Sequence, residues 1–284
     1  MKPIVDSLKY NTTKFRSRCI ILALSLILIS VKVMAEDAPN PTAVVSVAKK
    51  TNNDTEKEKQ DLNPYKPTYF MFQWGTHDPR DNQQLYAKFQ FNIKQNIWNG
   101  LYFAYTYRAL WSITEQSAPF KDNSHNPEIF YEIDNEGLVK IGQIGIEHES
   151  NGKGGVDSRS WNRVYWEPRL VYKRPEGKLF GFDTLAVYIK AWGKFEEKQS
   201  DNPDILDYYG NGELTIKLYS DENQIVVKAR KGLKKDYGNI QIEFMHRISE
   251  NFSLYAQFWD GYGESLLDYN RQTTRYGIGF ALTR

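Results

Sequence analysis

The stretch LYFAYTYRALW, residues 101–111, decides the fold, because large apolar residues occupy almost every second position of it. Side chains two residues apart on an extended strand share a face, so Phe103 and Tyr105 point one way while Thr106 and Arg108 point the other. A strand with one apolar and one polar face lies at the boundary between an apolar environment and water. This stretch therefore predicts a β-strand at such a boundary.

Similar segments of roughly ten residues follow one another from about Tyr65 onward, separated by Asn, Asp and Gly turns. We expect twelve strands, near residues 68–76, 84–94, 100–111, 127–133, 138–150, 162–173, 183–193, 205–219, 224–231, 238–247, 251–262 and 273–283. These segments are long enough to cross a membrane as tilted strands. Their polar faces carry long charged residues that suit an aqueous lumen: Lys88, Arg108, Lys190 and Arg275.

The sequence therefore predicts an all-β protein, a twelve-stranded antiparallel transmembrane β-barrel of the outer membrane formed by residues 65–284. A water-soluble β-sandwich is the alternative, because alternation also marks a half-buried strand.

Residues 1–35 are predicted to be a cleaved signal peptide. The segment has a basic start, an apolar run from Cys19 to Val31, and small residues near Ala35 that suit a cleavage site. A single membrane anchor is the alternative, but the run is shorter than the about 20 residues that a helical span needs. Residues 36–64 are polar and contain two prolines, so they predict a flexible N-terminal segment.

The charge balance changes once residues 1–35 are set aside. Their removal takes six Lys and Arg from 37 and one Asp from the 35 acids, which leaves 31 basic and 34 acidic residues and a charge of −3. This excludes the strongly basic surface that nucleic-acid binding requires. The single cysteine, Cys19, lies in the same segment, so the remainder has no disulfide and no cysteine nucleophile or metal ligand.

Three polar residues interrupt apolar faces of the predicted strands 138–150 and 162–173. His148 and Ser150 share a face with two isoleucines, and Asn162 shares one with a valine and a tryptophan. In a barrel these faces meet lipid, where an unsatisfied polar group costs about 1–3 kcal/mol. Ser, His and Asn are residue types that can act as a nucleophile, a base and an orienting group, so we expect a catalytic site. The alternative is a solvated extracellular loop over residues 149–162 in which the pair is incidental.

The motifs HESNG, residues 148–152, and SRSWNR, residues 158–163, resemble the signature of the outer membrane phospholipase A family. The resemblance covers residues 65–284, with further matching segments SAPF (117–120), NPE (126–128), DNPDI (201–205) and GYGES (261–265). It implies a twelve-stranded barrel in the outer membrane of a Gram-negative bacterium. It also implies a calcium-dependent serine ester hydrolase that cleaves acyl esters of phospholipids and lysophospholipids, with phospholipase A1, A2 and lysophospholipase activity.

The resemblance assigns a role to each residue of the site. Ser150 is the implied nucleophile, His148 the base that takes its proton, and Asn162 the group that orients the imidazole. A serine is inert until a base accepts its proton, and the base works better with its tautomer fixed. The backbone N–H of Gly152 is the implied donor to the oxyanion.

The resemblance also implies a calcium ion bound between two copies of the chain, which is active as a homodimer. The implied ligands are Ser117 of one copy and the backbone oxygens of Lys153 and Ser158 of the other, and oxygen-only ligation suits Ca²⁺. The family often has Arg in place of Lys153, and Tyr107 stands where a polar residue can help the dimer. Asp157 could add a carboxylate, or it could be a solvated loop acid.

A non-enzymatic outer-membrane barrel, porin-like or structural, is the alternative from another class, with His148 and Ser150 as a vestigial pair. A soluble secreted esterase is a further alternative.

Overall fold

The computed structural model describes residues 65–75, 85–133, 135, 137–195, 201–234 and 236–282. The predicted signal peptide and polar segment lie outside these residues, and both stay predictions. The chain divides into two compact units, and all strands described below belong to the larger one. No helix among the described residues is long and apolar enough to cross a membrane.

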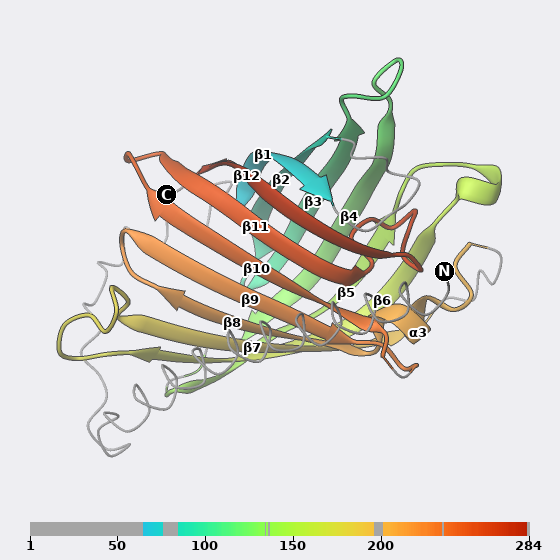
Figure 1. The fold of residues 1–284 in the computed structure, drawn as a ribbon. Coiled ribbons are helices and arrows are strands. Elements are labelled where there is room, and N and C mark those ends of the chain that lie inside the picture. The colour runs from blue at the N-terminus through green and yellow to red at the C-terminus, as the bar shows by residue number, and fades with distance from the viewer. Residues whose placement is uncertain are drawn as a thin grey trace. The chain divides into compact units, whose positions relative to one another are not determined.

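Twelve β-strands form the larger unit. Their bounds are β1 Thr68–Gly75, β2 Leu85–Trp98, β3 Leu101–Ser112, β4 Phe120–Ile133, β5 Val139–Ser150, β6 Ser160–Lys173, β7 Thr184–Lys194, β8 Gly212–Tyr219, β9 Asn223–Lys231, β10 Gly238–Arg247, β11 Phe252–Tyr262 and β12 Gln272–Leu282. Each strand pairs with its sequence neighbours in antiparallel register, as Figure 1 shows for the succession from cyan β1 to red β12.

The sheet closes on itself because β1 also pairs with β12. The closing register runs from Thr68 opposite Leu282 to Gly75 opposite Arg275. Closure leaves none of the twelve described strands with a row of unpaired N–H and C=O groups, which is the condition for a sheet surrounded by lipid. The predicted twelve-stranded antiparallel β-barrel is confirmed, and the sandwich alternative is wrong because one closed sheet replaces two packed sheets.

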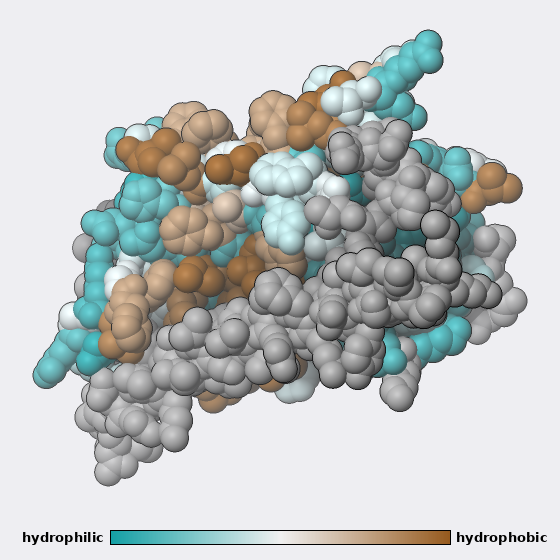
Figure 2. Space-filling view, in the orientation of Figure 1, coloured by the Kyte–Doolittle hydropathy of each residue, from teal (hydrophilic) through white to brown (hydrophobic). Residues whose placement is uncertain are grey.

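The two faces of the sheet differ in polarity. On β1, Phe70, Phe72 and Trp74 are 43–46% exposed on the outside, whereas Met71 and Gln73 are buried inside. Hydrophobic residues gather over the visible outer face of the strands in Figure 2, and hydrophilic residues lie at the loop ends. An apolar outer face and a polar inner face are the reverse of what a water-soluble protein shows, and they match a barrel whose outer surface contacts lipid.

Two predicted strands have different bounds in the structure. The predicted strand 205–219 begins instead with the short helix α3 (Ile205–Tyr209), which ends at Gly210 with a positive φ of 65°. The predicted strand 127–133 is the second half of β4, which already begins at Phe120. Its first half, KDNSHN, is polar on both faces, so it lacks the apolar alternation that marked the other strands.

A largely aromatic cluster packs inside the barrel and includes residues of α3. Trp161 of β6 is 1% exposed and stacks on Tyr209 of α3, with ring centroids 5.4 Å apart. The cluster contains Ala104, Phe130, Trp161, Tyr165, Trp192, Ile205, Tyr209, Leu266 and Tyr269. Through Trp161, this cluster holds the inner face of β6, whose outer face carries Asn162.

Candidate active site

Strand β5 presents His148 and Ser150 on the outside of the barrel. Both side chains are half-buried, and they share their face with Ile144 and Ile146, which are 46% and 52% exposed. The predicted parity of these residues is therefore confirmed, and they belong to the strand. The loop alternative is wrong in this respect, because β5 extends through Ser150.

Glu149, between His148 and Ser150, points into the barrel, where four polar side chains hold its carboxylate. The Glu149 carboxylate accepts hydrogen bonds from the Ser124 hydroxyl at 3.0 Å, the Trp161 indole at 3.1 Å and the Arg163 guanidinium at 3.2 Å. Arg108 adds an ion pair at 3.4 Å. Bonds to an ionised group are the stronger ones, so four anchors on the inner face hold the backbone that presents the two outer side chains.

His148 and Asn162 are direct neighbours across β5 and β6, as their register shows. His148 Nδ1 and Asn162 Oδ1 lie 2.8 Å apart. An amide oxygen only accepts, so Nδ1 carries the ring proton and Nε2 keeps a free lone pair. This is the tautomer that a general base facing a serine hydroxyl requires.

A proline beside His148 explains one further contact. Pro127 of β4 has no N–H to donate, and the register between β4 and β5 has a gap from His125 to Glu128. The Asn126 side-chain amide fills this gap by donating to the His148 carbonyl oxygen at 2.8 Å. The Asn-Pro pair therefore satisfies the backbone carbonyl of His148 from the next strand.

The loop from β5 to β6 is organised by Asn151, which is 2% exposed. Its side-chain oxygen accepts the backbone N–H of Arg159 at 3.0 Å, and its amide donates to the carbonyl of Asp157 at 2.8 Å. The next residue, Gly152, has a φ of +65°, a conformation that a side chain would strain. The structure thus places the Gly152 backbone two residues beyond Ser150 in a turn with a fixed geometry.

A second loop anchors the beginning of β6. The Asp201 carboxylate accepts the Ser158 hydroxyl at 3.1 Å and the Ser160 hydroxyl at 2.9 Å. Asn202 is fully buried, and its side-chain oxygen accepts the Ser160 backbone N–H at 2.9 Å. The segment DNPDI therefore holds the loop that precedes Asn162.

The predicted calcium residues lie in two loops. Lys153 and Ser158 both belong to the β5–β6 loop, and Ser117, with a φ of +64°, belongs to the β3–β4 loop. Within the described residues no group of three or more His, Cys, Asp or Glu side chains could hold a metal. The donor set offered to a cation consists of carbonyl and hydroxyl oxygens, with the Asp201 carboxylate beside Ser158.

One detail differs from the predicted use of Ser158. Its carbonyl oxygen accepts the Arg159 guanidinium at 2.7 Å, which places a positive charge where a cation was expected to bind. The Ser158 hydroxyl oxygen retains a free lone pair next to Asp201 and is the better candidate ligand. An oxygen-only set with one carboxylate still fits Ca²⁺.

Sequence reasoning missed His125 as a residue of this surface. His125 is half-buried on the outer face of β4 and lies directly opposite Ser150 in the register. It fell outside the predicted strand 127–133. Its odd-numbered position, shared with the outward Ile129 and Tyr131, is the signal that could have identified it.

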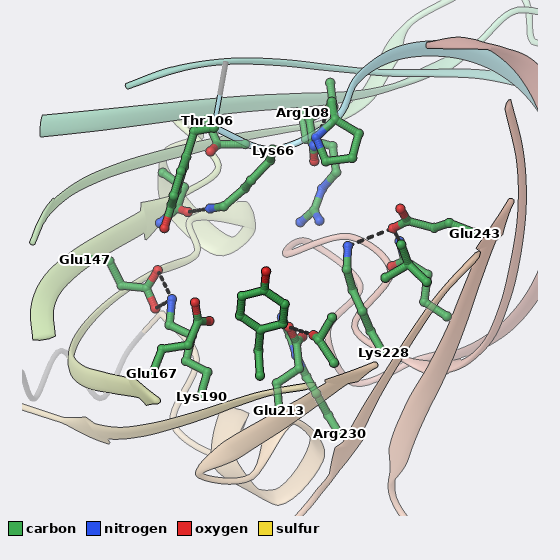
Figure 3. Close-up of a pocket in the computed structure, with 18 of the residues that line it drawn as sticks. Lys66, Thr106, Arg108, Glu147, Glu167, Lys190, Glu213, Lys228, Arg230 and Glu243 are labelled. Carbon is green, nitrogen blue, oxygen red and sulfur yellow. Dashed lines mark hydrogen bonds and ion pairs between the residues drawn. The ribbon is translucent and has the colours of Figure 1, made fainter. Parts of the chain in front are cut away.

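The interior cavity lies on the other side of the wall. The barrel contains a cavity of about 340 Å³. Figure 3 shows Glu147, Lys190 and other charged side chains around it. The Glu147 carboxylate accepts a hydrogen bond from Lys190 at 3.1 Å and forms an ion pair with Arg163 at 3.0 Å. The predicted charged lumen is therefore confirmed, and strand parity separates it from the outward His148.

The loop after β11 inserts Glu264 into one end of this lumen. Its carboxylate accepts hydrogen bonds from the Gln73 amide at 2.9 Å and the Arg275 guanidinium at 3.2 Å. The Lys88 ammonium forms an ion pair with it at 3.4 Å. Burial raises the pKa of the Glu264 carboxyl, but the charges of Lys88 and Arg275 outweigh this effect, so the pKa is lower than the usual value.

Known proteins are similar to this chain in fold and in sequence. A family model described as phospholipase A1 matches residues 45–282. The phospholipase A1 of Escherichia coli (strain K12) is 29% identical over 240 residues, which cover 79% of this chain and 77% of that protein.

Two solved structures extend the comparison. The outer membrane phospholipase dimer of Salmonella typhi with bound calcium has a TM-score of 0.68 and 26% identity, covering 78% of this chain and 92% of that one. An active-site mutant of Escherichia coli outer membrane phospholipase A, in which an Asn is replaced by Ala, has a TM-score of 0.67 and 26% identity, covering 78% and 91%. With the closed twelve-stranded barrel and its apolar outer face, these matches show that the chain belongs to the phospholipase A1 family and is an outer-membrane phospholipase.

Proposed function

We propose that this phospholipase hydrolyses acyl esters of phospholipids and lysophospholipids with a Ser150-His148-Asn162 triad, in a calcium-dependent reaction. One observation carries the proposal: the 2.8 Å hydrogen bond between His148 and Asn162 lies on the outer, apolar face of the barrel, next to Ser150. Polar groups at a lipid boundary are costly, and a catalytic function is a reason for a protein to keep them there. A phospholipid is the substrate that reaches this face.

The first half of the reaction follows from the tautomer of His148. Asn162 keeps the proton on Nδ1, so Nε2 accepts the Ser150 hydroxyl proton as Oγ attacks the ester carbonyl carbon. The carbonyl π electrons move to oxygen, and the backbone N–H of Gly152 donates to this oxyanion. The tetrahedral intermediate collapses, the bond to the glycerol oxygen breaks, and His148 returns its proton to that oxygen.

The second half repeats the same chemistry with water. His148 Nε2 takes a proton from a water molecule, which attacks the carbonyl of the acyl-Ser150 ester. Collapse of this second intermediate releases a fatty acid and returns the proton to Ser150 Oγ. Asn162 is neutral, so it holds the ring without offering a charge to the imidazolium that forms in each half.

The acyl chain has an apolar surface beside the triad. Ile144, Ile146, Val164 and Trp166 are 46–52% exposed on the outer faces of β5 and β6. Burying apolar surface contributes about 25 cal/mol per Å². A chain lying along these residues brings its ester to the level of Ser150, at the end of β5.

Calcium and a second copy of the chain complete the proposal. Lys153 and Ser158 would hold the ion in one copy and Ser117 in the other, with Asp201 supplying negative charge next to the Ser158 hydroxyl. When bound, Ca²⁺ supplies positive charge to the developing oxyanion. The calcium-bound dimer of the Salmonella typhi enzyme supports this part of the proposal.

The test compares wild type with Ser150→Ala in detergent micelles of a phosphatidylcholine with CaCl₂. We expect fatty-acid release by the variant to fall by about 10⁴-fold or more. Equal rates for the two proteins would overturn the triad. Excess EDTA should abolish wild-type activity and added CaCl₂ restore it, whereas full activity in EDTA would overturn the calcium dependence alone.

A further inference from the structure

A second histidine lies beside the proposed nucleophile. His125 of β4 pairs with Ser150 of β5 across the sheet, and both side chains point out of the barrel. Residues directly opposite in an antiparallel pair have Cβ atoms roughly 4.5–5.5 Å apart. Ser150 therefore has His148 two residues before it, Gly152 two residues after it, and His125 across from it.

Strand β3 holds the His125 ring in one orientation. The Tyr105 hydroxyl lies 2.7 Å from His125 Nδ1. The Tyr107 ring packs against the imidazole at 5.2 Å between centroids, and its own hydroxyl donates to Asn123 at 2.8 Å. The ring is thus fixed by two tyrosines before any substrate binds.

This arrangement determines where the proton of His125 lies. A phenol is a better donor than acceptor, so the Tyr105 hydroxyl donates to Nδ1 and the ring proton sits on Nε2. The Nε2 edge faces Gly152, because a Cβ built on Gly152 would lie 3.5 Å from His125 Nε2. Within the described part of the chain no hydrogen bond uses this Nε2–H.

We propose that His125 is a catalytic residue whose Nε2–H, together with the backbone N–H of Gly152, donates to the oxyanion formed at Ser150. This inference rests on the proposed triad and adds a side-chain donor to it. As Ser150 Oγ bonds to the carbonyl carbon, the π pair moves to oxygen and the serine proton goes to His148. His125 keeps its own proton throughout and only shares it with the oxyanion in a hydrogen bond.

The same geometry argues against two other roles. His125 cannot be a second base for Ser150, because the nitrogen that faces the site already carries a proton. It is not a simple space filler either, because Phe or Leu would occupy this lipid-facing position without a polar atom to satisfy. A pre-oriented donor next to a glycine turn is the arrangement that stabilises a developing oxyanion.

The experiment compares His125→Phe, which keeps a ring but removes the donor, with His125→Gln, whose amide N–H can take the place of Nε2–H. His246→Phe is the matched control, since His246 lies exposed on β10 and pairs with Asn223. With a phosphatidylcholine in micelles and CaCl₂, His125→Phe should lower kcat by about 10²-fold and change KM little. His125→Gln should recover most of this loss, and His246→Phe should behave as wild type.

A second measurement separates catalysis from packing. A long-chain trifluoromethyl ketone forms a tetrahedral adduct with an active serine, so its inhibition constant should rise in His125→Phe in parallel with the fall in kcat/KM. The role of His125 would be overturned if His125→Phe kept full activity. It would also be overturned if kcat/KM fell in His125→Phe while the inhibition constant of the ketone stayed unchanged. His125→Met provides a second donor-free variant if the Phe variant does not fold. Loss of activity in Ser150→Ala with none in His125→Phe would leave the triad standing and remove only this inference.

Discussion

Replacing Asn162 by alanine removes the partner of His148 without touching the base or the nucleophile. The lost interaction is one hydrogen bond of 2.8 Å between a neutral amide oxygen and Nδ1. Such a bond contributes about 0.5–1.5 kcal/mol net. Since about 1.4 kcal/mol corresponds to a factor of ten in rate, we expect Asn162→Ala to lower kcat by about 2- to 13-fold.

The loss should appear in kcat and not in KM. Asn162 holds the ring while His148 becomes an imidazolium, and the substrate chain lies against apolar residues that the substitution leaves in place. An interaction made mainly in the transition state lowers kcat and kcat/KM equally. The reduction should be far smaller than that of Ser150→Ala, because the base and nucleophile remain.

The assay is calcium-dependent release of fatty acid from a micellar phosphatidylcholine at several concentrations. Asn223→Ala is a matched control, because Asn223 Oδ1 lies 2.9 Å from His246 Nδ1 in an exposed pair of the same kind. The reasoning is wrong if Asn162→Ala is as active as wild type. It is also wrong if a folded Asn162→Ala is as inactive as Ser150→Ala, since one neutral hydrogen bond is too weak to account for that.

Further predictions concern the residues around the triad. Glu149→Gln should lower the free energy of unfolding by about 1–3 kcal/mol, because the Glu149 carboxylate holds three hydrogen bonds. On gels of samples heated to increasing temperatures, the band of the folded, heat-modifiable barrel should disappear at a lower temperature than in wild type. Glu222→Gln, at an exposed position, should have no effect. Gly152→Ala should reduce kcat with a folded barrel, because φ of +65° strains a side chain there; wild-type kcat would contradict this. The pKa of Glu264 is lowered in the folded state, so its stabilisation is present above its usual pKa near 4.5 and is lost as the pH falls below it. Glu264→Gln should therefore be less stable at pH 7 and lose less stability on acidification than wild type, as thermal melts at both pH values would establish.

The alternation of apolar and polar residues along the chain was enough to predict most of the barrel. Parity placed Ile144, Ile146 and His148 on one face of β5 and gave the number of strands, because lipid outside and water inside act on every second residue. The family resemblance implied the contact of His148 with Asn162. Alternation alone did not set the strand register that makes these residues direct neighbours.

Contacts between segments far apart in the sequence could not be predicted in this way. Asp201 lies about forty residues from Ser158 and Ser160, yet its carboxylate holds both hydroxyls. Helix α3 was mistaken for part of a strand, because its apolar residues face the aromatic cluster and five residues are too few for a helical period. Such contacts depend on how loops fold over the end of the barrel, which no local pattern records.

The two faces of β5 together explain why an ion-pair network lines the inside of a barrel whose proposed catalytic site lies on the outside. Glu147 and Glu149 carry the network on the inner face, and His148 and Ser150 alternate with them on the outer face. A residue on a strand cannot move without its two neighbours, so each inner anchor restrains an outer side chain of the proposed triad. Lipid tails offer no polar partner that could hold His148 from outside. Apart from the Asn162 hydrogen bond, the rigidity that the proposed triad requires must therefore come through the wall, and a charged, cross-linked lumen supplies it.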